Sequence, residues 1–574
     1  MIWLLVILFP LLLSLVAPAA EGDARRRGAL LSAAALPALL AGLAIVPVET
    51  AAFPGLFLGA EFGLDTPRGA LLTLAALLWG IAGAFAGAYL RRDAHPVRFA
   101  FFFLLAMSGT FGLIVAQDVP SFYTCFVVMT FASYPLVIHT ATPEARRAGR
   151  IYLVMAVAGE LFLIFSLYGA VQAADSLLLV DLAPAVADAE NGRNLLLLGL
   201  IGFGVKAGAV PLYFWLPLAH PVAPTPASAV LSGVMIKAGL LGWLHLAPLG
   251  QPDPTGWAEM LIVLGLLAAF GAAAIGFFQE DPKTTLAYSS ISQMGLMTVL
   301  LGLGMKAGAS EAAVAGALAL YAFNHGLAKG ALFLGTGVVA AVSHGRLWVM
   351  AGLATGAIGI AGGPLTGGAL AKYGLKETAS LAPSPWENLV LGLLPFATLA
   401  TSLLLGRFLW LCWKKPGSQA EDSPAGLVLP WALLTAAALI LPWWLNPYLG
   451  LDVPVPAFSF AAWFEATWPL VAAGAILLVA LRLSEKALPC LPPGDFIVPI
   501  ERLVSMCGAA AKHAGLRYPA RGSIDLAALS DRLLALEDAR ELMDRAEARL
   551  SRWRVVGALF ILIALGFILA AWAI

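Results

Sequence analysis

Charged residues are scarce in this chain, and their scarcity excludes an ordinary water-soluble protein. Only 12% of the 574 residues are charged, whereas a soluble domain has about 25%. Hydrophobic residues make up 60% of the chain, and the mean hydropathy is +0.88. Apolar runs of about 20 residues, long enough to cross a bilayer, recur along the sequence. We therefore predict an all-α polytopic membrane protein.

Cysteines and nucleotide-binding motifs are also sparse. The four cysteines are scattered and form no CxxC pair, so the sequence indicates no iron–sulfur cluster, zinc site or disulfide framework. It contains neither a GxGxxG motif nor a P-loop. Its 34 basic and 34 acidic residues balance, which gives no case for nucleic-acid binding. We expect no cofactor, no metal and no enzyme activity in this chain by itself, because redox cofactors would belong to partner subunits.

The apolar runs predict sixteen membrane crossings. The loops between predicted crossings alternate between arginine-rich ones, at 25–27, 91–98 and 144–150, and acidic or neutral ones. The positive-inside rule places the arginine-rich loops in the cytoplasm and therefore both termini on the outer side. The first run, 1–20, has no basic residue before it, and we expect a retained helix rather than a signal peptide. The expected location is a prokaryotic cytoplasmic (inner) membrane.

The predicted crossings fall into six regions. Two five-helix units have opposite orientations because five is an odd number, as in an inverted-repeat transporter. The long polar segment near the C-terminus is predicted to be a cytoplasmic amphipathic helix that lies on the membrane or this bundle, or docks on a neighbouring subunit. The regions are three N-terminal helices (1–95), a first repeat (96–250), a second repeat (255–415), additional helices (425–485), the amphipathic segment (486–552) and a final transmembrane helix (553–574).

Ionisable residues inside the apolar runs are the main functional signal. A charge at the bilayer centre costs roughly 2.5–3.5 kcal/mol, so such residues usually line a wet cavity or pair with one another. A buried lysine can switch between its charged and neutral forms when a neighbouring carboxylate moves, and a series of such groups can relay protons. The alternative roles are helix-packing ion pairs and side chains that extend to the headgroups. The candidates are Glu160, Lys206, Lys237, His325, Lys329 and Lys372.

Two of the predicted helices are interrupted. Pro211 follows Lys206, and Pro364 stands among glycines eight residues before Lys372. Interruptions at membrane depth are tolerated where they line a cavity, and in paired positions they point to the functional site of an inverted-repeat transporter. Superposing the two repeats makes Lys206 and Lys372 counterparts.

Three stretches resemble a known family. They are VKAGAVPLYFWLPLAHPVAPTPASAVLSGVMIKAG, FFQEDPKTTLAYSSISQMG and NHGLAKGALFLGTG. Together they resemble the antiporter-like subunits shared by respiratory complex I, Mrp-type cation/proton antiporters and membrane-bound hydrogenases, over about residues 70–410. The resemblance implies fourteen core helices with broken helices seven and twelve, and one ion-translocating module among other membrane subunits of a complex.

The resemblance also implies roles for individual residues. Lys206 matches the central lysine of helix seven, Lys237 the helix-eight lysine that passes protons inward, and Lys372 the group near the outward exit. The remaining matches are the helix-eleven pair, His325 and Lys329, and the bend after the first broken helix, His220 with Pro221.

One departure from the family concerns helix five. The family has a glutamate there that pairs with the helix-seven lysine, but the corresponding position, near Val127, carries no acid. We predict that Glu160, on the adjacent helix six, supplies the missing carboxylate. Gln293 stands where many members have histidine.

These observations predict an ion-translocating membrane subunit. It would move protons, alone or in exchange for Na⁺ or another monovalent cation, and is most similar to an Mrp-type antiporter subunit. The first alternative is a proton-pumping subunit of a complex I-like NADH/quinone oxidoreductase, membrane-bound hydrogenase or formate hydrogenlyase. The second is a non-conducting structural subunit, suggested by Val127. A carrier of organic solutes that works alone is the third.

Overall fold

The computed structural model describes residues 2–20, 22–44, 48–57, 59–250, 253, 255–342, 345–415, 425–450, 459–483 and 491. The chain divides into two compact units, Met1–Ala52 with Ala60–Pro493 and Phe53–Gly59 with Gly494–Ile574. The helices below belong to the first unit. The predicted final helix, and all of the predicted amphipathic segment except residue 491, lie outside the described residues.

The N-terminal part contains four α-helices and a hairpin. The helices are α1 (Ile2–Val16), α2 (Ala24–Ala33), α3 (Leu36–Leu43) and α4 (Thr66–Tyr89), and a short 3₁₀ turn follows α1. Strands β1 (Val48–Phe53) and β2 (Ala60–Leu64) pair in a two-stranded sheet between α3 and α4. The apolar run at about 29–48 predicts a single crossing, but the structure has the two short helices α2 and α3 there, because the chain turns before Pro37, which lacks the N–H that would continue a helix.

The region predicted as the first repeat contains the elements from α5 to α12. Its elements are α5 (Pro96–Val115), α6 (Val119–Val137), α7 (Pro143–Ala174), α8 (Leu182–Asp188), α9 (Gly192–Ala207), α10 (Trp215–Val222), α11 (Thr225–Val230), a π turn (Leu231–Met235) and α12 (Lys237–Leu244). The predicted break of helix seven is confirmed, because α9 and α10 are separate helices. The short α8 and the π turn have no counterpart in the sequence prediction.

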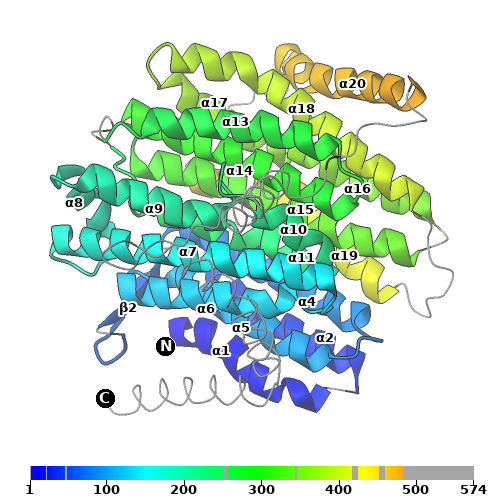
Figure 1. The fold of residues 1–574 in the computed structure, drawn as a ribbon, viewed down its shortest axis with the longest axis horizontal. Coiled ribbons are helices and arrows are strands. Elements are labelled where there is room, and N and C mark those ends of the chain that lie inside the picture. Colours follow the sequence, from blue (N-terminus) through cyan, green and yellow to red (C-terminus); the bar gives the residue numbers. More distant parts are fainter. Residues whose placement is uncertain are drawn as a thin grey trace, which may run out of the picture. The chain divides into compact units, whose positions relative to one another are not determined.

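The region predicted as the second repeat and the helices after it contain the elements from α13 to α20. They are α13 (Ala258–Phe277), α14 (Pro282–Ala307), α15 (Glu311–Ala341), α16 (Arg346–Ala361), α17 (Gly367–Ser380), α18 (Trp386–Lys414), α19 (Ala425–Leu445) and α20 (Phe460–Leu483). The break of helix twelve, between α16 and α17, is confirmed. Within the first unit, Figure 1 shows α1 and α2 near one edge of the helical array and α17, α18 and α20 near the opposite edge.

Acidic caps followed by proline start several of the long helices. Asp65, Asp118 and Asp281 accept hydrogen bonds from backbone N–H groups at the starts of α4, α6 and α14. Each helix has proline at its first or second position, where the missing N–H costs nothing. The sequence therefore sets where these helices begin.

The centre of the first unit is formed by a few fully surrounded helices. In the described residues, eleven helices are long and apolar enough to cross a membrane. The apolar windows of α14 and of the α11–α12 segment are 100% buried, whereas those of α7 and α20 are 39% and 11% buried. Lys237 and the residues of α14 therefore lie in the centre, and Glu160 projects from a peripheral helix.

Candidate functional site: a buried series of lysines

The first broken helix ends one residue after Lys206. Gly208 caps α9 with φ +69°, a left-handed conformation that glycine adopts without strain. Pro211 follows in the break and cannot supply a backbone N–H. The indole Nε1 of Trp215, at the start of α10, donates to the Val205 carbonyl at 2.7 Å, so one of the carbonyls near the end of α9 has a partner.

The second broken helix holds Lys372 in a different way. α16 ends at Ala361, Gly362 follows with φ +81°, and Pro364 lies in the break. Lys372 belongs to α17, and its Nζ reaches back to donate to the Ala361 carbonyl at 2.6 Å. The same Nζ donates to the Thr398 hydroxyl of α18 at 2.5 Å.

The two lysines are thus not simple counterparts along the chain. Lys206 precedes its break, whereas Lys372 follows its break, so the predicted one-to-one superposition is wrong in chain position. Their electrostatic setting is nevertheless shared. Each ammonium group lies at the C-terminal end of a half-helix, where the helix dipole is negative and favours a cation.

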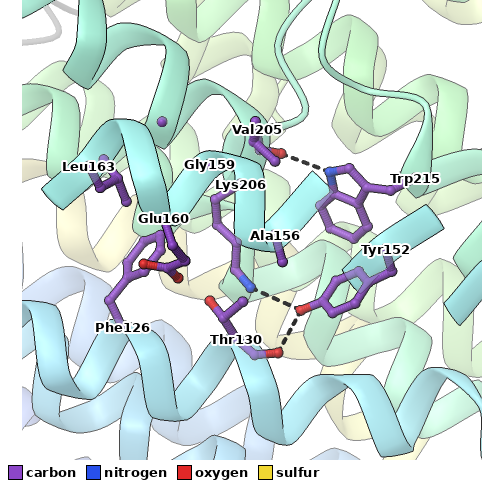
Figure 2. Close-up of a pocket in the computed structure, with 11 residues that line it drawn as sticks. Phe126, Thr130, Tyr152, Ala156, Gly159, Glu160, Leu163, Val205, Lys206 and Trp215 are labelled. Carbon is purple, nitrogen blue, oxygen red and sulfur yellow. Dashed lines mark hydrogen bonds between the residues drawn. The ribbon is translucent and has the colours of Figure 1, made fainter. Parts of the chain in front are cut away.

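Glu160 and Lys206 line one small cavity of about 20 Å³. Figure 2 shows the Glu160 carboxylate on α7 and the Lys206 ammonium on α9 projecting into the same space, with the ammonium turned toward Tyr152. Lys206 Nζ donates to the Tyr152 hydroxyl at 3.3 Å, and that hydroxyl donates to the Thr130 carbonyl at 2.8 Å. Both Glu160 oxygens are buried, and the polar groups that act on this carboxylate are the Lys206 ammonium and the Tyr123 hydroxyl of α6. The two side chains therefore share a cavity without direct contact.

Aromatic rings occupy the side of Lys206 where the family has its helix-five glutamate. Lys206 Nζ lies 5.9 Å from the centre of the Phe126 ring and 5.7 Å from that of Tyr152. Ring faces attract ammonium groups, more strongly where water is excluded. Phe126 precedes Val127, so α6 presents a ring to Lys206 in place of a carboxylate.

Lys237 pairs with a histidine of another helix. It lies two residues after the end of the π turn Leu231–Met235, a kind of distortion frequent at functional sites. Its Nζ donates to the Ser232 carbonyl within that turn at 2.7 Å and lies 2.7 Å from Nδ1 of His325 on α15. The structure therefore joins His325 to Lys237 rather than to Lys329.

Lys329 and His220 have separate surroundings. Lys329 Nζ donates to the Leu286 carbonyl at 2.7 Å and to the Ser289 hydroxyl at 2.5 Å, both on α14. The His220 ring stacks on Phe333 with centroids 4.6 Å apart, and its two nitrogens have no hydrogen-bond partner in the described residues. His220 and Pro221, where the bend was predicted, lie inside α10, and the helix ends at Val222.

Uncharged polar residues connect the centre to Lys372. The Tyr321 hydroxyl of α15 donates to Gln293 Oε1 at 3.0 Å, and Gln293 Nε2 donates to the Thr401 hydroxyl at 3.1 Å. Thr401 lies one turn from Thr398 on α18, and Thr398 accepts the hydrogen bond of Lys372. We call Tyr321, Gln293, Thr401 and Thr398 the Gln293 link.

The Gln293 link begins beside His325. Tyr321 and His325 are four residues apart on α15 and therefore share one face of the helix. Hydrogen bonds and helical neighbours thus run from Lys237 through His325 and the link to Lys372. Sequence reasoning noted Gln293 but missed Tyr321, Thr398 and Thr401, because hydroxyl groups inside apolar helices carry no charge signal.

A cavity approaches Lys237 from one end of the bundle. Lys237 lines a space of about 10 Å³ that shares Leu71 and Leu241 with a cavity of about 160 Å³ lined by Arg68 and His245. The larger cavity lies at the start of α4 and the end of α12, an end that the loop charges assign to the outside. The resemblance implies inward access for Lys237, so this cavity is an unexpected feature.

All six predicted relay residues are buried. Their exposed fractions range from 0% for Lys329 to 8% for Lys372, so the four lysines do not extend to the surface as headgroup-seeking side chains would. In the part of the chain that the structure describes, no group of three or more His, Cys, Asp or Glu side chains could hold a metal ion. The site is suited to holding and moving protons.

Comparisons with known proteins find similarity to one membrane-protein family and to subunits of several membrane complexes. A model of the family described as NADH:quinone oxidoreductase/Mrp antiporter, TM, matches residues 116–359. Hydrogenase-4 component B of Escherichia coli is 30% identical over 298 residues, covering 49% of this chain and 43% of that protein. A Na(+)/H(+) antiporter subunit of Alkalihalophilus pseudofirmus is 27% identical over 422 residues, covering 69% and 83%.

The solved structures agree with the sequence comparisons in fold. A chain of the Mrp complex from a Dietzia species superposes with a TM-score of 0.75 at 24% identity, covering 95% of this chain and 63% of that one. The chain spans about half the length of the first curated relatives that it matches, from 43% to 56% of three of them. At these identities the structural match shows the fold.

Proposed function

We propose, from the premise that this chain belongs to the NADH:quinone oxidoreductase/Mrp antiporter membrane family, that it is an ion-translocating subunit of a multi-subunit complex. It moves protons, alone or in exchange for Na⁺ or another monovalent cation. Its partners are other membrane subunits of that complex. The protein is multi-pass, and we place it in a prokaryotic cytoplasmic membrane.

The observation that carries the proposal is the continuity of buried polar groups between Lys237 and Lys372. Lys237 and His325 are 2.7 Å apart, and the Gln293 link ends at Thr398, which is 2.5 Å from Lys372 Nζ. Lone buried polar groups are costly. A set of buried amines bonded to hydroxyls, carbonyls and one imidazole supports a proton path better than an inert core.

Lys206 joins this series through close helix packing. A Cβ atom on Gly239 of α12 would collide with the Phe203 carbonyl and lie 2.7 Å from the Ala207 nitrogen of α9. The two backbones therefore approach closely one residue from Lys206 and two residues from Lys237. In our proposal, water carries protons between the two amines across this helix contact.

Glu160 gates the entry to Lys206 in our proposal. The shared cavity of about 20 Å³ exceeds the roughly 10–15 Å³ that one water needs. It presents the two Glu160 oxygens, the Thr130 hydroxyl and Lys206 Nζ, which are enough polar partners for one water. A bridging water would couple the charges of Glu160 and Lys206 without direct contact.

The test is proton transport by the assembled complex in sealed vesicles. Lys206→Ala should reduce transport by about tenfold or more, because the amine and its hydrogen bond are lost. Lys306→Ala is the matched control, since Lys306 forms an exposed ion pair with Glu259 outside the series. Wild-type transport in Lys206→Ala with normal assembly would contradict the proposal.

A non-conducting structural subunit is the second candidate. Val127 in place of an acid, and the absence of direct contact between Glu160 and Lys206 in the described structure, favour it. This reading predicts that Lys206→Ala and Lys237→Ala both leave transport by the complex unchanged. The vesicle assay therefore separates the two candidates.

The parent complex is proposed to be Mrp-like, with complex I-like and hydrogenase-like assemblies as the alternatives. Absence of a redox motif in the sequence favours the Mrp-like assembly. Similarity to hydrogenase-4 component B supports the hydrogenase-like alternative. Purification of the native complex decides between them. Copurified subunits that carry redox cofactors would contradict an Mrp-like antiporter.

The orientation follows from the loop charges. We propose that Ser310, before α15, faces outward and that Lys414, at the end of α18, faces the cytoplasm. In a chain whose four cysteines are replaced by alanine, Ser310→Cys should react with an impermeant thiol reagent in intact cells and Lys414→Cys only in inverted vesicles. The reverse pattern would overturn the orientation.

A further inference from the structure

A cavity that Lys372 lines lies beside the second broken helix. It measures about 270 Å³ and is bordered by α17, α18, α19 and α20. Lys372 lines it from the buried side, and Lys376 and Glu465 line it near the surface. Because one water needs only roughly 10–15 Å³, the cavity can hold several.

The charged side chains that line this cavity differ in how far they are exposed. Lys372 is 8% exposed, whereas the side chains of Lys376 and Glu465 are 33% and 46% exposed. Lys372 and Lys376 are one turn apart on α17, so their ammonium groups repel each other when both are charged. Lys376 Nζ forms an ion pair with Glu465, and Glu465 is the single carboxylate among the described residues that line the cavity.

The carboxylate comes from a helix outside the matched family region. α20 lies beyond residues 116–359, and only 11% of its apolar window is buried. It packs against α18, where Trp468 meets Phe396 edge to face with centroids 6.2 Å apart. α20 is thus a peripheral wall that brings one acid to a cavity otherwise lined by amines, the Thr398 hydroxyl, a phenol, two indoles and apolar groups.

We propose that Glu465 is the terminal proton acceptor of the series and that its ion pair with Lys376 closes the cavity between transfers. The inference rests on the proposed function. A proton leaves the Lys372 ammonium through cavity water and binds the Glu465 carboxylate. Lys372 and Glu465 both become neutral, and the attraction between Glu465 and Lys376 is lost. The proton then leaves Glu465 for solvent, and the ion pair forms again.

Two single variants separate this role from a structural ion pair. Glu465→Gln removes the acceptor, so transport by the assembled complex should fall about tenfold or more. Lys376→Gln keeps the acceptor Glu465 but removes the ion pair that closes the cavity. Transport should therefore persist within about twofold, while passive proton leak rises several-fold. A purely structural pair predicts equal losses in both variants, which would overturn the proposal.

A charge exchange keeps the test valid if one variant assembles poorly. Lys376→Glu with Glu465→Lys retains an acid in the cavity, so transport should return to within about twofold of wild type. Glu259→Gln is the matched control, because it breaks the exposed pair with Lys306 elsewhere. Wild-type transport in Glu465→Gln, with transport lost in Lys372→Ala, would end this inference and leave the proposed function standing. Unchanged transport in Lys372→Ala would count against both.

Discussion

At the scale of single residues, the buried amines are held by carbonyls, hydroxyls and rings rather than by carboxylates. Lys372 binds Ala361 and Thr398, and Lys206 binds Tyr152. A full ion pair would fix an ammonium group in its charged form, whereas neutral acceptors stabilise the charge less. Such surroundings favour amines that can lose and regain a proton.

Glu160 is the residue on which coupling at Lys206 depends in this account. We expect Glu160→Gln to abolish proton coupling as severely as Lys206→Ala, because the amide cannot change charge when a proton arrives. The measurement is acidification by the assembled complex in vesicles. Glu144→Gln, in the first turn of the same helix and outside the cavity, is the control. Normal coupling in Glu160→Gln would remove that carboxylate from the mechanism.

Thr398 is the residue that joins Lys372 to the Gln293 link. Thr398→Val keeps the side-chain shape but removes the hydroxyl, and a hydrogen bond to a charged group is worth about 1.5–3 kcal/mol. Transport should therefore fall roughly tenfold or more, and Thr398→Ser should retain most of it. Equal rates in the valine and serine variants would show that the hydroxyl is dispensable.

At the scale of elements, the broken helices were predictable and the distortion before Lys237 was not. The two breaks could be predicted from Pro211 and Pro364 and from the glycines beside them. The π turn Leu231–Met235 could not be predicted from its sequence, because glycine and serine also occur within the regular helices of this chain and the geometry of the turn follows from packing. The partner of His325 was missed for the same reason, since contacts between helices distant in sequence depend on packing.

We expect the close packing of α9 against α12 to tolerate larger side chains less than any other helix contact. Gly239→Ala should separate the helices, because the added Cβ would collide with the Phe203 carbonyl and with the Ala207 nitrogen at 2.7 Å. Overpacking costs about 1–3 kcal/mol, so the midpoint of thermal unfolding should fall by several degrees. Gly271→Ala, on α13 with no atom within 4 Å of the new Cβ, should unfold like wild type. An unchanged midpoint in Gly239→Ala would refute the contact.

At the scale of the whole molecule, composition predicted a helical membrane protein, and the fold of the described residues confirms it. The division into two inverted repeats stays a prediction. The ionisable residues could be found from sequence because charge is rare in apolar runs. Tyr152, the Gln293 link hydroxyls and Glu465 could not, since neutral groups and exposed acids occur throughout the sequence. Only the fold shows that they meet the lysines.

The most direct measurement of the central claim is proton translocation by the assembled complex with Lys237 replaced by glutamine. Glutamine preserves a hydrogen-bond donor for Ser232 and His325 but cannot hold a transferable charge at neutral pH. Our account predicts that translocation is lost in sealed vesicles while assembly and thermal stability remain normal. Translocation at the wild-type rate in that variant would contradict a proton path through the buried lysines.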